Sequence, residues 1–107
     1  MVAKGVDFLT EAAKAVKDEV KTPHVSLRQL LLYLDVAENE GISQAELREK
    51  HDLTVASATR EMKALGKDHY DLLDTTIRHP TRINSAAVRL TAKGRELIQK
   101  IKGLWEE

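Results

Sequence analysis

The chain has 107 residues, with 17 acidic and 17 basic side chains and no cysteine. This length predicts a single domain over residues 1–107 with a modest core, and the absence of cysteine excludes disulfides, thiolate metal sites and cysteine nucleophiles. The net charge of zero gives no sign of a nucleic-acid partner, although a local basic surface would not show in the sum. No apolar run is long enough for a membrane span, and no signal-peptide pattern is present, so we expect a cytoplasmic protein.

The first predicted element is an amphipathic helix over residues 6–21. Its apolar residues recur at spacings of three and four, which is typical of a helix that packs against another helix. They are Val6, Leu9, Ala13, Val16 and Val20. This helix packs either on its own domain or on a second copy of the chain, and the second interpretation is slightly favoured. The segment Thr22–His24 contains a proline that ends the helix.

Residues 26–65 are predicted to form a three-helix core. Ser26 and Gln29 have the spacing of a capping box at the start of the first helix, and Gly41 suits a left-handed residue after its end. A short helix follows over Ser43–His51, with Asp52 and Leu53 as a turn. A further helix begins after Thr54 and is ended by Gly66. The two helices of residues 43–65 share an apolar seam and form a helix-turn-helix; the seam residues are Leu47, Leu53, Ala58, Met62 and Leu65.

The pattern changes to strands after Gly66. Leu72–Arg78 is rich in β-branched residues, and Ala86–Leu90 alternates small or apolar with polar side chains, with turn formers and a proline between them. We therefore predict a β-hairpin, or wing, over residues 72–90. A last helix is predicted over residues 92–105, capped by Thr91. Its apolar stripe consists of Leu97, Ile98, Ile101, Leu104 and Trp105.

The outer surface of the second helix of the helix-turn-helix carries small, hydroxylated and basic side chains. Such side chains enter a major groove without clashes and bond to base edges and phosphates. The candidate DNA-binding residues on this helix are Thr54, Ala56, Ser57, Thr59, Arg60 and Lys63, and Val55 shares the same surface. Three alternatives stay open: Ser57 only supports the helix cap, Arg60 pairs with an acid of the preceding helix, or Lys63 is simply solvated.

The wing adds basic residues close to that helix. Residues 75–95 contain five lysines and arginines and no acidic residue. In residues 35–52, by contrast, acidic residues outnumber lysines and arginines. Arg78 and Arg82 are the candidates for contact with phosphates or a narrow minor groove. The alternative is a hairpin that is basic only for solubility.

The segment Ala87–Leu97 resembles the end of the wing in the multiple antibiotic resistance regulator (MarR) family, where Val-x-Leu-Thr leads through x-x-Gly into a helix. The matching positions are Val88, Leu90, Thr91 and Gly94. Ile42–Leu47 and Leu53–Arg60 are similar, more loosely, to the second and third helices of that family. The chain departs from the family at Lys67–Asp71, which intervene before the wing, and at Arg82, which is only an approximate counterpart of the minor-groove arginine.

The resemblance, to a shortened member of the family, implies a winged helix-turn-helix: mainly α, with a small β-hairpin wing and flanking N- and C-terminal helices. It implies a sequence-specific double-stranded DNA-binding transcriptional regulator rather than an enzyme. A homodimer is expected to form through the Val6–Val20 and Leu97–Trp105 helices, because so small a domain would not cover both stripes. No cofactor or metal site is expected, and an effector is not identified. The alternatives are a winged-helix protein-interaction module and a replication or architectural DNA-binding protein.

Overall fold

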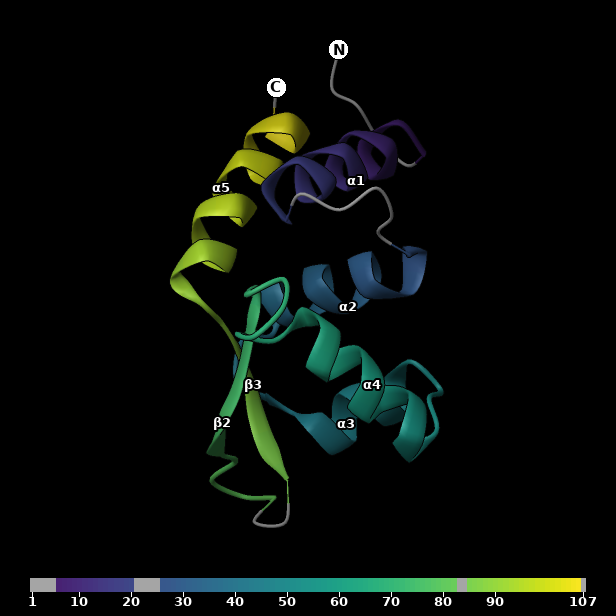
Figure 1. The fold of residues 1–107 in the computed structure, drawn as a ribbon, viewed down its shortest axis with the longest axis vertical. Coiled ribbons are helices and arrows are strands. Elements are labelled where there is room, and N and C mark those ends of the chain that lie inside the picture. The colour runs from purple at the N-terminus through teal and green to yellow at the C-terminus, as the bar shows by residue number, and fades with distance from the viewer. Residues whose placement is uncertain (1–5, 21–25, 83–84, 107) are drawn as a thin grey trace.

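The computed structural model describes residues 6–20, 26–82 and 85–106. Within these residues the chain forms five helices and a three-stranded antiparallel sheet with the strand order β1-β3-β2 (Figure 1). The elements are α1 (Val6–Val20), α2 (Leu27–Glu38), β1 (Ile42–Ser43), α3 (Gln44–Lys50), α4 (Val55–Leu65), β2 (Leu73–Arg78), β3 (Ala86–Leu90) and α5 (Ala92–Glu106). The predicted mainly α fold with a hairpin wing is confirmed.

The helices α1 and α5 pack against each other at the end of the molecule where both termini lie (Figure 1). Val16 of α1 and Leu97, Ile98 and Ile101 of α5 are buried within this one chain. The argument that the domain would leave both stripes uncovered is therefore wrong for these side chains, since each helix covers the other. The side chains of Val6, Leu9, Val20, Leu104 and Trp105 lie outside the described residues, as does the predicted break at residues 22–24.

The helix α2 lies in the middle of the molecule and starts as predicted. The Ser26 hydroxyl accepts a hydrogen bond from the Gln29 backbone N–H at 3.0 Å, and the Gln29 side chain accepts from the Ser26 N–H at 3.2 Å. Tyr33 is completely buried, and its hydroxyl donates to the Gly94 carbonyl oxygen at 2.6 Å. Burial, with a smaller contribution from the charge of Glu19, raises the pKa of Tyr33, so this donor stays neutral.

The helix-turn-helix comprises α3 and α4. Ser43 caps α3 by accepting from the Glu46 N–H, and Thr54 caps α4 by accepting from the Ser57 N–H, both at 3.0 Å. Asp52, in the turn, has a φ of 55°, in the left-handed region that a short aspartate side chain tolerates. The predicted seam is confirmed, because all five of its apolar side chains are buried.

The short strand β1 is the element that the sequence analysis missed. It pairs with β3 in the register Ile42–Val88 and Ser43–Ala87, so the wing is part of the same sheet as the start of the helix-turn-helix. The Ala45 N–H also donates to the Ser85 hydroxyl at 3.0 Å. A strand of two residues, the second of which is the helix cap Ser43, has no periodic pattern, so the sequence here indicates only the cap.

The segment between the wing and α5 is tightly packed. Thr91 caps α5 by accepting from the Gly94 N–H at 3.0 Å, and its own N–H donates to the Leu72 carbonyl oxygen at 3.0 Å. A Cβ atom at Gly94 would lie 2.4 Å from that same carbonyl oxygen. Glycine is therefore required at position 94 by the close approach of α5 to the start of β2.

Candidate nucleic-acid interface

The exposed part of α4 faces the wing along one line of side chains. Val55, Thr59 and Lys63 are spaced four residues apart and line two adjoining hollows between α4, α3 and the wing. Ala56 and Arg60 lie beside this line and are also exposed, while Ser57 is partly buried. The predicted outer surface of α4 is thus present and open within the part of the chain that the structure describes.

The first turn of α4 organises its own polar groups. The Thr54 hydroxyl is engaged as the N-cap, and the guanidinium of Arg60 donates to the Ser57 hydroxyl at 3.3 Å. Ser57 therefore supports the cap through its backbone N–H and orients Arg60 through its hydroxyl. No acid among the described residues forms an ion pair with Arg60 or Lys63, which leaves their charges available to a ligand.

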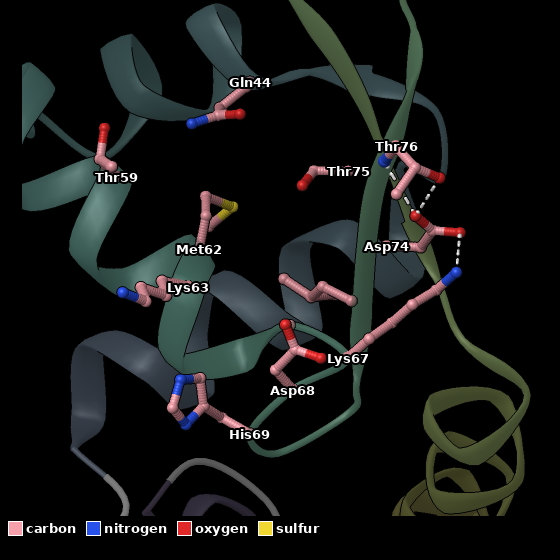
Figure 2. A pocket seen from close by; sticks show the side chains of 12 residues that line it. Gln44, Thr59, Met62, Lys63, Lys67, Asp68, His69, Asp74, Thr75 and Thr76 are labelled. Carbon is pink, nitrogen blue, oxygen red and sulfur yellow. Dashed lines mark hydrogen bonds and ion pairs between the residues drawn. The ribbon is translucent and has the colours of Figure 1, made fainter.

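The larger hollow, of about 430 Å³, lies between α4 and β2. In Figure 2, Met62 and Thr75 point toward its centre, Gln44 of α3 closes one end, and Lys67 reaches across from the end of α4 to Asp74 on β2. The smaller hollow, of about 290 Å³, lies nearer the start of α4, where Ala45, Ala58 and Ala86 form part of its lining.

A β-bulge shapes the wing beside the larger hollow. The β2–β3 register shifts between Asp74 and Ile77, and Asp74 accepts hydrogen bonds from the backbone N–H (2.9 Å) and the hydroxyl (2.6 Å) of Thr76. These bonds, with the neighbouring Lys67, hold the pKa of Asp74 below its usual value. Asp74 is therefore negatively charged at neutral pH, and a carboxylate oxygen of Asp74 lies 3.6 Å from the Lys67 ammonium.

The wing arginines are exposed but not equally free. Arg82 lies 3.5 Å from a carboxylate oxygen of Glu49 on α3, whereas no described acid pairs with Arg78. Arg95, also in the acid-free run of the sequence, forms a two-pronged ion pair with Glu40 on the opposite side of β3. The segment of residues 75–95 contains no acid, but acids distant in sequence reach Arg82 of the wing and Arg95 of α5 in space.

Gln44 and Arg48 of α3 line the hollows and were not among the candidate residues. The first turn of α3 faces the wing because β1 immediately precedes it, and a sequence reading without β1 could not place it there. Six of the eight candidates nevertheless belong to α4 and its cap, and Arg78 and Arg82 belong to the wing. In Figure 1, α4 and the wing lie at the end of the molecule away from the termini.

No protein-family model and no curated protein matches the sequence. Solved structures do match. A structure of MarR matches with a TM-score of 0.62 and 20% identity over 92% of this chain. RV1404 from Mycobacterium tuberculosis matches with a TM-score of 0.68 and 16% identity over 92% of this chain, and a mutant MarR from E. coli complexed with operator DNA matches with a TM-score of 0.63 and 13% identity over 91% of this chain. This chain spans 72%, 63% and 67% of those chains, respectively. No helix in the described part of the chain has the length and apolar character needed to cross a bilayer. The described residues thus have the winged helix-turn-helix fold found in MarR-family regulators.

Proposed function

We propose that the protein is a sequence-specific double-stranded DNA-binding transcriptional regulator. In this proposal α4 enters the major groove, where Ser57, Thr59 and Arg60 contact base edges or nearby phosphates and Lys63 contacts the backbone. Arg78 and Arg82 of the wing contact the backbone or the minor groove. The observation that carries the proposal is the open, cationic outer surface of α4 beside an arginine-bearing wing, on a fold that in a similar solved structure is complexed with operator DNA.

The arrangement of the wing supports this assignment physically. The β1–β3 pairing and the bond between Ala45 and Ser85 fix the hairpin to the start of α3. These contacts hold phosphate donors of the wing near α4, and simultaneous contact with a groove and its backbone requires donors in both places.

The direct test is selection of bound duplexes from a random pool, followed by affinity measurements on the selected site. Arg60→Ala should weaken binding to that site by ~1–3 kcal/mol and relax specificity at one position. Lys63→Ala should weaken binding to all duplexes and lower the salt slope by about one. Lys102→Ala, an exposed lysine of α5 at the other end of the fold, is the matched control and should change neither. Equal affinities for Arg60→Ala and the unaltered protein would contradict the proposed role of α4.

A homodimer on a near-palindromic site remains part of the proposal. Since Val16 of α1 and Leu97, Ile98 and Ile101 of α5 are buried within the chain, such a dimer would use other side chains of these helices. Sedimentation at micromolar concentration tests this part, and a monomer there that also selects a single, non-repeated site would overturn it.

The second candidate function is a winged-helix protein-interaction module. It is favoured by the acidic residues that lie near α4 and the wing. Glu49 pairs with Arg82, and Asp74 pairs with Lys67, so part of the basic charge is already neutralised. A gel shift on random duplex at low salt separates the two candidates. A regulator shows weak nonspecific binding that weakens with salt, whereas an interaction module shows none.

A further inference from the structure

Val55 stands out on the outer surface of α4, which is proposed to contact base edges, because its side chain cannot form hydrogen bonds. It is the first residue of α4, its side chain is 67% exposed, and it is the most exposed large apolar residue that the structure describes. A β-branched residue at an exposed helical position is also a weaker helix former than alanine. Neither the burial of apolar surface nor helix propensity therefore explains valine at this position.

Val55 borders a hollow whose lining is half apolar and half polar. The 290 Å³ hollow is lined by Val55, by the three alanines Ala45, Ala58 and Ala86, and by the polar residues Gln44, Arg48, Thr59 and Ser85. Arg60 and the Ser57 hydroxyl, which are bonded to each other, are the hydrogen-bonding pair of this turn. Val55 is therefore the one large apolar side chain among the residues that line this hollow, and the hydrogen-bonding pair lies next to it on the same turn.

From this juxtaposition we infer that Val55 is a specificity-determining residue that recognises the 5-methyl group of a thymine in the major groove. The methyl group is the one apolar feature that any base edge presents there, and a side chain of carbon and hydrogen discriminates in its favour by contact alone. The stiff χ1 angle of valine keeps its two methyl groups in place for this contact. The inference rests on the proposed function, in which the first turn of α4 meets base edges.

The experiment replaces, one at a time, each thymine of the selected duplex by uracil, which removes only the methyl group. For the unaltered protein, at least one replacement should weaken binding about fourfold, the value of one buried methyl group. The same replacement should have no effect on Val55→Ser or on Val55→Asn, because neither side chain carries a methyl group to contact the thymine.

Leu27→Ala is the matched control. Leu27 is likewise the first residue of a helix after a hydroxyl cap, and it is 61% exposed, but it lies on α2. The Leu27→Ala protein should bind the uracil duplex more weakly than the thymine duplex by the same factor as the unaltered protein. The inference is overturned if no thymine-to-uracil replacement weakens binding, or if both Val55 variants retain the loss. A protein that selects no duplex at all would instead overturn the proposed function, so the two failures are distinguishable.

Discussion

Replacement of Gly94 by alanine isolates a steric requirement of the fold. On helix propensity alone, alanine in α5 would stabilise the protein by about 1 kcal/mol relative to glycine. The new Cβ, however, would lie 2.4 Å from the carbonyl oxygen of Leu72 and 3.2 Å from its carbonyl carbon. These are backbone atoms, so either the start of α5 or the start of β2 must move. Such overpacking costs ~1–3 kcal/mol, and movement would also stretch the 2.6 Å bond from Tyr33 to the Gly94 carbonyl.

We expect Gly94→Ala to lower the free energy of unfolding by about 1–3 kcal/mol, measured by urea denaturation followed by circular dichroism. Gly103→Ala is the control within the same helix, because a Cβ there would meet no atom within 4 Å. It should raise the stability by up to about 1 kcal/mol. A Gly94→Ala protein as stable as Gly103→Ala would refute the reasoning, since the close approach to Leu72 would then carry no energetic consequence.

Three further predictions concern single contacts. Tyr33→Phe leaves the Gly94 carbonyl without its buried donor and should destabilise the fold by about 1–2 kcal/mol in the same denaturation assay. For Asp35, burial alone would raise the pKa, but hydrogen bonds from neighbouring side chains outweigh it and lower the pKa below 3.8. Its contribution to stability is therefore present above that pH and lost below it, so Asp35→Asn should flatten the fall in unfolding free energy below about pH 4. Glu49→Gln frees Arg82 and should tighten binding to random duplex by up to about fivefold at low salt, as a gel shift would show; unchanged binding would mean that the pair does not compete with phosphate.

The helices were predictable because their signals are local. Ser26, Ser43 and Thr54 each accept a hydrogen bond from the backbone N–H three residues later, and these caps fixed three helix starts from a few residues of sequence. The strand β1 was not predictable in this way. Its two residues are held by pairing with β3, more than forty positions further along the chain, and nothing near Ile42 records that partner.

The candidate site was predictable in its helix but not in its electrostatics. The outer residues of α4 follow from helical periodicity once the buried seam is known. The state of the wing depends instead on which acids reach it in space. Glu49 lies 33 positions from Arg82 of the wing, and Glu40 lies 55 positions from Arg95 of α5. The acid-free segment of residues 75–95 gave no sign of either pair.

The motif on which the family resemblance rests, Val88, Leu90, Thr91 and Gly94, stabilises the fold and is not among the candidate DNA-contacting residues. Thr91 and Gly94 join β2, α2 and α5 through the Leu72 carbonyl and the Tyr33 hydroxyl, and Val88 is a fully buried residue of the central strand. Any chain that joins a wing to a helix in this way needs a capping hydroxyl and a glycine at these places, whatever duplex it binds. Under the proposed function, specificity then comes from α4, where Val55, Thr59 and Arg60 are exposed and their identity can change without cost to the core. The resemblance therefore predicts the fold, whereas the proposed selection of a duplex site rests on the sequence of α4.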